Sequence, residues 1–256
     1  MLNLRSFRDY PDVFRDGGED AVLSDREKEA AALLAVRSRR QLWVLGRLTV
    51  KELVQRWYDE HGAQVPGARQ ISVLPAPGGA PTIRVEGDPV RRLSTSISYC
   101  DAHAFASVRD ADPGHRFAVV MDRIEPLYPF FDDSLLTEDE VSRVRHEEAA
   151  TQNQLLTAFG CLKKGVGKAL GLTSAAPASH VEVLAVTPGG EATVRYDPEL
   201  FGGDTRPVVR GRVWFYDTYV LAFAGLWRSE EAAPPALARI EEEPVLPDSR
   251  YTEWSR

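Results

Sequence analysis

The sequence has few cysteines and no long apolar segment. Its 256 residues include two cysteines, Cys100 and Cys161, which form no Cys-x-x-Cys pair and each lie within an apolar run. Such positions are typical of buried thiols in a reducing compartment. The longest charge-free stretches are interrupted by proline, glycine and polar residues, and they stay well short of the roughly 20 apolar residues that a membrane span needs. The sequence therefore predicts neither a disulfide scaffold nor a membrane-spanning segment.

The N-terminal region also lacks the apolar core of a secretory signal, because its first 20 residues mix charges of both signs. We therefore expect a cytoplasmic protein. Acidic residues outnumber basic ones, 38 to 31, which gives a formal net charge of -7. This balance argues against general nucleic-acid binding, while a local basic patch can still hold a phosphate-bearing ligand.

The composition and the order of elements predict the fold class. Hydrophobic residues make up 43% of the chain, enough for a core, and the length permits one large domain or two small lobes. The expected order is helix, helix, strands, then helix and strands. We expect an α+β fold with an N-terminal lobe over residues 1–115, a C-terminal lobe over 116–228 and a surface tail over 229–256. We find no fixed-period sequence repeat, so we expect any internal symmetry to be one of architecture.

The first half begins with 20 residues that show neither a helical nor a strand period, which predicts an ordered arm or loop. Ser24 and Glu27 then have the spacing of a capping box, in which each side chain accepts a hydrogen bond from a free backbone N–H at a helix start. They predict a helix over residues 25–35. Leucines spaced three to five apart follow an arginine cluster and predict a second helix that ends near residues 61–62.

Short β-prone runs punctuated by proline and glycine come next. They predict strands at residues 82–85, 94–98, 104–108 and 117–121. The second and third of these runs are close enough to form a hairpin. The fourth is continuously apolar, which is typical of a strand buried on both faces.

The second half has one long helical region and four strands. The helical pattern runs over residues 137–171, either continuous or broken near residues 147–150. Gly165 and Gly167 each lower helix propensity by about 1 kcal/mol relative to alanine, which indicates either a weakened helix or the close approach of another group. Strands are predicted at residues 180–186, 191–196, 208–216 and 219–224.

Taken in order, these segments resemble the surfactin-type 4′-phosphopantetheinyl transferases, a family of two similar α+β lobes with a coenzyme A site between them. No single motif is specific, but their order and spacing match over most of the chain. The matching segments are Leu45-Gly46-Arg47, Gly79-Ala80-Pro81, the strand region Leu93 to Val108, the strand Val119 to Pro126, and Leu162-Lys163-Lys164 with Lys168 beyond it.

The resemblance implies transfer of a phosphopantetheine arm from coenzyme A to a carrier-protein serine, with Mg²⁺ held by carboxylates. A hard cation requires such oxygen ligands. This sequence departs from the family pattern at three of four positions. Val120 stands at an expected aspartate, while Asp122 keeps the second carboxylate. Lys164 replaces a glutamate, and Tyr99 replaces a histidine. A one-residue shift would offer Asp122 and Glu125 instead, but side chains three residues apart on a strand point to opposite faces.

These substitutions indicate that metal-dependent transfer is lost, and they define the candidate site. The candidate catalytic residues are Tyr99, Asp122 and Lys164, with no metal ligand set. Each also has a plainer interpretation. Lys164 and Asp122 form either a functional pair or a salt bridge that fills the former metal site. Tyr99 either donates to a substrate oxygen or is a half-buried aromatic residue at a strand end.

Basic residues provide the candidate phosphate contacts. By the resemblance, Arg40, Arg47, Lys163 and Lys168 would bind coenzyme A or a phosphopantetheine arm, because guanidinium and ammonium groups suit phosphate oxygens. Arg37 and Arg39 either join them or belong to a solvated helix face.

Further residues have both a functional and a structural interpretation. His103 either enters the cleft or lies at the surface. Cys161 is either a nucleophile activated by neighbouring lysines or a buried helix cysteine. Glu147 and Glu148 either reach the cleft or are solvated.

Three functions remain open from the sequence, and whether the chain is an enzyme stays open with them. The first is a transferase-fold protein, expected as a monomer, that acts on or binds a carrier-protein-linked or coenzyme-A-linked intermediate in polyketide or peptide natural-product biosynthesis. The second is a working phosphopantetheinyl transferase with relocated ligands such as Glu125, Glu147 or Glu148, which alone would need Mg²⁺. The third is a non-catalytic scaffold that docks carrier proteins.

Overall fold

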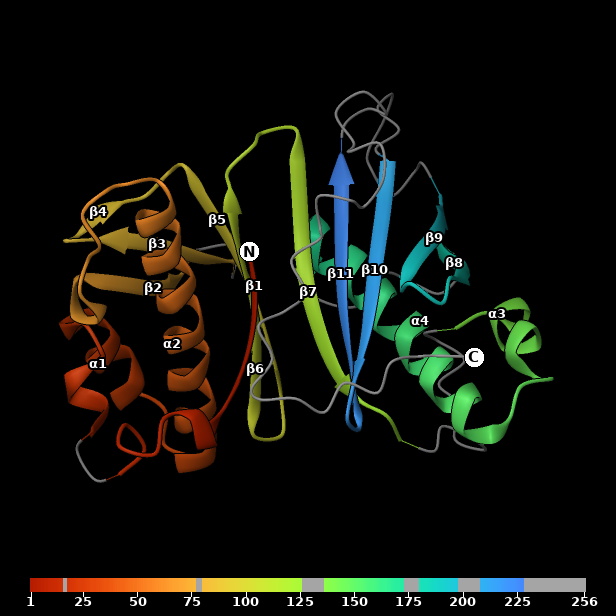
Figure 1. Cartoon of the computed structure of the whole chain (residues 1–256), viewed down its shortest axis with the longest axis horizontal. Coiled ribbons are helices and arrows are strands. Elements are labelled where there is room, and N and C mark those ends of the chain that lie inside the picture. The colour runs from red at the N-terminus through yellow and green to blue at the C-terminus, as the bar shows by residue number, and fades with distance from the viewer. Residues whose placement is uncertain (16–17, 77–79, 126–135, 173–179, 198–207, 228–256) are drawn as a thin grey trace. The chain divides into compact units, whose positions relative to one another are not determined.

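The chain divides into two compact units, the first from Met1 to Ala111 and the second beginning at Asp112. The computed structural model describes residues 1–15, 18–76, 80–125, 136–172, 180–197 and 208–227 (Figure 1). Both units combine helices with antiparallel strands, which confirms the α+β class. Gly79, Pro126 and the predicted tail over 229–256 lie outside the described residues.

The described residues of the first unit form two α-helices and six strands. They are β1 (Leu2–Ser6), α1 (Asp25–Ala32), α2 (Arg37–Glu60), β2 (Ile71–Pro75), β3 (Pro81–Val85), β4 (Asp88–Pro89), β5 (Leu93–Cys100) and β6 (His103–Asp110), with short 3-10 helices at Phe7–Asp9, Gly18–Ala21 and Ala68–Gln70. The strands pair in the orders β1-β6-β5 and β2-β3-β4. Apolar residues of α2, including Leu53 and Trp57, form a core cluster with strand residues such as Ile71 and Ala106.

The expectation of an irregular N-terminal arm was wrong for its first residues. Residues Leu2–Ser6 form strand β1, which pairs antiparallel with β6. Leu2 and Leu4 are buried, and the alternation of these leucines with Asn3 and Arg5 is a two-residue strand period. This short period alone does not identify a partner, and pairing with the distant strand β6 completes the order of the segment.

The helix starts and the hairpin of the first unit follow the sequence signals. Ser24 caps α1 and forms the predicted capping box with Glu27. Strands β5 and β6 form the predicted hairpin, with two residues between them, and Asp101 at the turn has a positive φ of 49°. Helix α2 begins earlier than its leucine pattern, because the arginine cluster at residues 37–40 forms its first turn.

The second unit contains a five-stranded sheet with helix α4 packed on two of its strands (Figure 1). Its elements are β7 (His115–Arg123), α3 (Glu138–Val144), α4 (Ala149–Leu170), β8 (Val181–Val186), β9 (Glu191–Tyr196), β10 (Val208–Tyr216) and β11 (Tyr219–Trp227). The sheet order is β7-β11-β10-β9-β8. The helical region is broken, as one of the two predictions had it, between Val144 and Ala149.

The apolar core of this unit depends on a close contact between α4 and the sheet. Val120, on the predicted buried strand, is 7% exposed and belongs to a core cluster with Phe159, Leu162 and Ala222. A Cβ atom on Gly165 would lie 3.0 Å from the Cβ of Ala224, which supports close approach as the reason for this glycine. No helix in the described part of the chain is both long enough and apolar enough to cross a bilayer.

Candidate functional site

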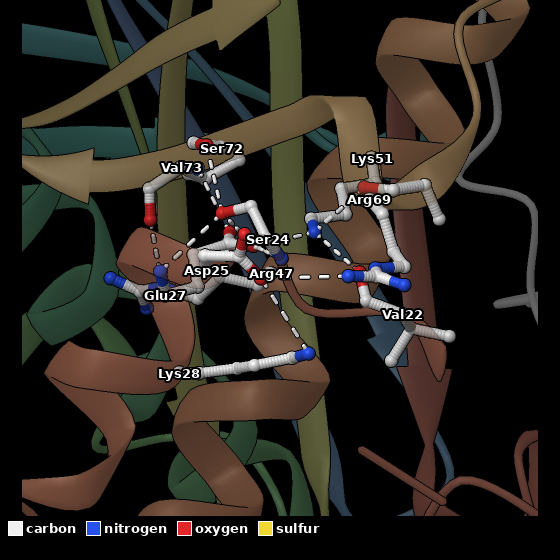
Figure 2. Close-up of polar contacts among 11 residues, drawn as sticks. Val22, Ser24, Asp25, Glu27, Lys28, Arg47, Lys51, Arg69, Ser72 and Val73 are labelled. Carbon is white, nitrogen blue, oxygen red and sulfur yellow. Dashed lines mark hydrogen bonds and ion pairs between the residues drawn. The ribbon is translucent and has the colours of Figure 1, made fainter. Parts of the chain in front are cut away.

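A buried ion pair in the first unit ties α1, α2 and β2 together (Figure 2). Lys51 Nζ on α2 lies 2.6 Å from Glu27 Oε2, and both side chains are almost completely buried. The other oxygen, Glu27 Oε1, accepts from the backbone N–H of Val73 at 2.9 Å, while Ser24 donates to the carboxylate through its N–H and its hydroxyl. Burial lowers the pKa of Lys51, and Glu27 partly offsets that effect. We call these three side chains and the Val73 peptide the first clamp.

The second unit contains the same arrangement. Lys163 Nζ on α4 lies 2.5 Å from Glu140 Oε2, and Glu140 Oε1 accepts from the N–H of Val183 at 2.7 Å. Thr137 completes the capping box with Glu140. Lys163 is fully buried, and this burial lowers its pKa against the opposing effect of Glu140. We call this group the second clamp, and its geometry assigns Lys163 to the framework of the unit rather than to a phosphate ligand.

The two clamps reveal an internal repeat that we did not find in the sequence. The glutamate and lysine are 24 residues apart in the first clamp and 23 in the second. The glutamate and valine are 46 and 43 residues apart. Because insertions change the spacing, the repeat has no fixed period, and the signal that could have found it is the pair of capping boxes at residues 24–27 and 137–140.

Arg47 of the predicted site is held against the first clamp. Its Nε donates to the carbonyl oxygen of Val73 at 3.1 Å, and its guanidinium carbon lies 3.9 Å from the centre of the Trp43 ring. The residue is 6% exposed, and this burial lowers the pKa of the guanidinium, with Tyr99 and Glu27 opposing the effect. An arginine remains charged in such a site. It is therefore a buried cation that is held on two sides, by the Val73 carbonyl and the Trp43 ring.

Tyr99 is the direct partner of Arg47. Arg47 Nη1 donates to the Tyr99 hydroxyl oxygen at 2.6 Å. Since that oxygen accepts, its own O–H is directed elsewhere and can donate to a ligand. Burial of the hydroxyl raises the pKa of Tyr99, although Arg47 opposes the shift and the side chain as a whole is 36% exposed. Tyr99 is therefore a hydrogen-bond donor at neutral pH and not a base.

The Gly46 position allows the Tyr99 ring to lie on α2. A Cβ atom at Gly46 would lie 2.3 Å from Tyr99 Cε1 and 2.5 Å from its hydroxyl oxygen. Real Cβ contacts essentially never come this close. The Gly46-Arg47 pair thus has a local physical role. The glycine leaves space for the Tyr99 ring, and the arginine donates a hydrogen bond to the Tyr99 hydroxyl.

Arg40 lines a pocket further toward the start of α2. The pocket has a volume of about 310 Å³ and is lined by Phe14, Arg15, Glu19, Asp20, Leu34, Ala35, Arg37, Arg40 and Gln41. Arg40 Nε lies 2.8 Å from Glu19 Oε2, so one carboxylate already orients it. Arg40 and Arg47 are seven residues apart, which places them on one side of α2 with a separation of about 10 Å along its axis.

In the second unit the structure brings Asp122 and Lys164 together. Lys164 Nζ donates to Asp122 Oδ2 at 2.6 Å, and the backbone N–H of Arg123 donates to Asp122 Oδ1 at 3.0 Å. Both carboxylate oxygens therefore accept hydrogen bonds. The two side chains are about two-fifths exposed, so an ion pair of this kind contributes only about 0–1 kcal/mol to stability.

The groups around this pair do not fit Mg²⁺. Val120 and Asp122 are two residues apart on β7, so they point to one face of the sheet, and Val120 offers no ligand atom. The ammonium of Lys164, which pairs with Asp122, carries a positive charge and cannot serve as a ligand for Mg²⁺. Glu125, which the shifted alignment required, is exposed beyond the end of β7. Within the ranges that the structure describes, no three His, Cys, Asp or Glu side chains form a group able to hold a metal ion.

Lys168 lies one turn beyond Lys164 on α4. Its Nζ donates to the carbonyl oxygen of Val119 at 3.1 Å, although part of the side chain is exposed. Desolvation of the ammonium lowers its pKa to about 8. Lys168 is therefore the candidate phosphate contact whose charge changes near neutral pH.

The structure also places the remaining candidate residues, which are a cysteine, a histidine and two glutamates. Cys161 is fully buried in the core cluster, which supports the structural interpretation. His103 is half-buried at the first position of β6. Glu147 and Glu148 precede the first residue of α4, about 24 Å along the helix axis from Lys164, so they cannot join the Asp122–Lys164 pair.

The predicted site residues thus form two groups, one in each unit. Arg47 and Tyr99 are joined by a hydrogen bond in the first unit, and Asp122 and Lys164 in the second.

Comparisons with known proteins add one partial likeness. No family model and no curated protein matches the sequence. Among solved structures, the chain is similar to a holo-(acyl-carrier-protein) synthase from Bacillus anthracis strain Ames in complex with CoA (3′,5′-ADP), with 16% identity and a TM-score of 0.36. The match covers 44% of this chain and 96% of the synthase. A likeness of this size does not identify the function of the chain.

Proposed function

We propose that this chain is a protein of the phosphopantetheinyl transferase fold that no longer performs Mg²⁺-dependent transfer and instead binds a coenzyme-A-linked or carrier-protein-linked intermediate of polyketide or peptide biosynthesis. The observation that carries the proposal is the Asp122–Lys164 ion pair at the positions that the resemblance gives to metal ligands. The resemblance suggests the class of ligand, a coenzyme-A-linked or carrier-protein-linked compound. The ion pair is the reason for proposing that Mg²⁺-dependent transfer is lost.

Charge explains why the pair favours a metal-free site. A lysine at a ligand position adds a positive charge where a divalent cation would need a negative one, so the two repel each other. The carboxylate of Asp122 is neutralised by the ammonium and already accepts two hydrogen bonds. An ammonium group is itself a hydrogen-bond donor, so Lys164 supplies positive charge to a ligand oxygen without a metal ion.

Arginines of the first unit supply the proposed phosphate contacts. Arg40 lines the 310 Å³ pocket, and Arg47 lies about two helical turns further along α2. Guanidinium groups bind phosphate oxygens through paired N–H donors. A ligand with phosphates at two positions, as coenzyme A has, suits cations arranged along one helix. Lys168 is the proposed phosphate contact of the second unit.

Tyr99 supplies a proton donor for an oxygen of the bound intermediate. Its oxygen accepts from Arg47, so the neighbouring cation strengthens the phenol as a hydrogen-bond donor. A thioester or ketone carbonyl is the type of group that such a donor polarises. The protein partner in this proposal is an acyl or peptidyl carrier protein that presents the tethered intermediate.

The test is a carrier-protein mass assay with a chelator arm. We expect that the chain, incubated with coenzyme A, Mg²⁺ and an apo carrier protein, produces no phosphopantetheine mass increase, and that coenzyme A binding by calorimetry is unchanged by EDTA. A mass increase that EDTA abolishes would establish the alternative, a working transferase. Carrier-protein binding without any coenzyme A binding would instead support a scaffold.

A gain-of-ligand variant makes this test sharper. The double change Val120→Asp/Lys164→Glu restores two carboxylates beside Asp122 on α4 and β7. We expect Mg²⁺ to bind this variant and not the wild type, as measured by calorimetry. The control Lys164→Met removes the ammonium without adding a ligand, and it should not bind Mg²⁺. Equal Mg²⁺ binding by the wild type would contradict the proposal.

A further inference from the structure

We infer that Glu27 is a positioning residue for the Arg47–Tyr99 pair, acting through the peptide of Val73. The inference rests on the proposed function, since it concerns the coenzyme A contact that Arg47 would make. It adds a residue that the resemblance does not include and that touches no ligand itself.

The connection runs through one residue at the edge of a sheet. Strand β2 is an outer strand, paired on one side with β3. Outer strands leave backbone N–H and C=O groups without a strand partner. At Val73 both groups are satisfied by side chains: Glu27 Oε1 accepts from its N–H at 2.9 Å, and Arg47 Nε donates to its C=O at 3.1 Å. Figure 2 shows these residues at the junction of α1, α2 and β2.

Glu27 is itself fixed on several sides. Its carboxylate accepts from the Ser24 N–H and hydroxyl, from Lys51 at 2.6 Å and from the Val73 N–H. Its side chain is completely buried, so water does not replace these hydrogen bonds. A fixed carboxylate fixes the Val73 peptide, and a fixed peptide carbonyl holds the guanidinium of Arg47 in the plane from which it reaches Tyr99.

Arg47 depends on this support because one of its two hydrogen bonds is made to the Val73 carbonyl. Its two hydrogen bonds use Nε for Val73 and Nη1 for Tyr99. The third nitrogen, Nη2, takes part in neither bond and is the one left to meet a phosphate oxygen. Orientation matters for that contact, since the guanidinium is planar and rigid, so the two bonds at Nε and Nη1 set the direction of the N–H groups on Nη2.

The second clamp provides a matched control within the same chain. Val183, on the outer strand β8, donates its N–H to Glu140 and accepts at its carbonyl from Arg143 Nη1 at 2.7 Å. Arg143 comes from α3, and its other terminal nitrogen pairs with Glu182. The backbone is thus clamped in the same way, but the arginine ends in a structural ion pair and not at a tyrosine.

The experiment replaces each clamp without leaving a buried charge alone. The double variant Glu27→Leu/Lys51→Met removes the first clamp, and Glu140→Leu/Lys163→Met removes the second. Apolar replacement of a buried pair is often neutral for stability, whereas removal of one partner is strongly destabilising. A rescue variant, Glu27→Gln/Lys51→Met, restores an acceptor for the Val73 N–H but not the charge.

We expect the first-clamp variant to bind coenzyme A about tenfold or more weakly by calorimetry, the loss of one charge-assisted hydrogen bond. The second-clamp variant should stay within about twofold of the wild type, and the glutamine rescue should recover most of the affinity. In ¹⁵N NMR, the Arg47 Nε–H signal should exchange with water faster only in the first-clamp leucine variant.

Three results distinguish this inference from the proposed function. Unchanged affinity together with an unchanged Arg47 Nε–H signal in the folded leucine variant would overturn the positioning role. Equal losses of affinity in both clamp variants would also overturn it, because they would show that the clamps act only through the stability of the chain. Absence of coenzyme A binding by the wild type would overturn the proposed function instead, while the NMR signal would still report whether Glu27 holds Arg47.

Discussion

A single methyl group added at Gly46 should displace Tyr99 from α2. The new Cβ atom would lie 2.3 to 2.7 Å from three atoms of the Tyr99 ring and hydroxyl group. The helix backbone at Gly46 is buried and cannot retreat, whereas Tyr99 is 36% exposed and can turn outward. We therefore expect Gly46→Ala to break the 2.6 Å hydrogen bond between Arg47 and Tyr99.

The magnitude follows from two opposing terms. Alanine is favoured over glycine within a helix by about 1 kcal/mol. Loss of a hydrogen bond to a charged group costs about 1.5–3 kcal/mol. The expected net effect is a decrease of about 0.5–2 kcal/mol in the free energy of unfolding, measured by urea denaturation. Coenzyme A affinity should fall in the same variant if Tyr99 and Arg47 bind the ligand.

A double-mutant cycle with Tyr99→Ala isolates the contact from helix propensity. Without the ring, the added methyl group meets no obstacle from Tyr99, so Gly46→Ala should stabilise the chain by about 1 kcal/mol in that background. The sign of the effect therefore reverses between the two backgrounds. The same stability change in both would refute the contact and, with it, the orientation of Tyr99 that the proposed function uses.

Three other measurements test the second unit. Because the pKa of Lys168 is lowered to about 8, its charge is lost as pH rises through 8, so coenzyme A affinity should decline across that range in the wild type and not in Lys168→Met. For stability the sign is opposite, because the unfolded chain binds this proton more tightly than the folded chain does. The contribution of Lys168 to the free energy of unfolding should therefore increase from pH 8 toward its ordinary pKa of 10.5. Urea denaturation of the wild type and of Lys168→Met across this range measures the change. Leu162→Ala, in the core cluster beneath β10 and β11, should lower the free energy of unfolding by about 2–5 kcal/mol, and a loss below 1 kcal/mol would contradict the packing of α4.

The sequence was sufficient where structure depends on local signals. The Ser24–Glu27 capping box, the hairpin of β5 and β6, and the apolar strand β7 each follow from residues a few positions apart. The placement of Asp122 near Lys164 also followed from the sequence, because the resemblance aligned a strand with a helix that packs on it.

The sequence was insufficient where a contact joins distant segments. Strand β1 needs β6 as a partner, and neither local propensity nor charge predicts which strand it pairs with. Lys163 has a positive charge that suits a phosphate contact. Its burial against Glu140, 23 residues earlier, instead makes it part of the second clamp.

Sequence by itself therefore determined the chemical types available to this protein: the ammonium of Lys164 and the phenol of Tyr99 beside a carboxylate, Asp122, and a set of arginines. Only the tertiary structure decided which of those groups meet, because pairing depends on the packing of helices against strand edges. The Val73 peptide illustrates the reason, since its two polar groups join residues 27 and 47 through a strand that neither of them belongs to.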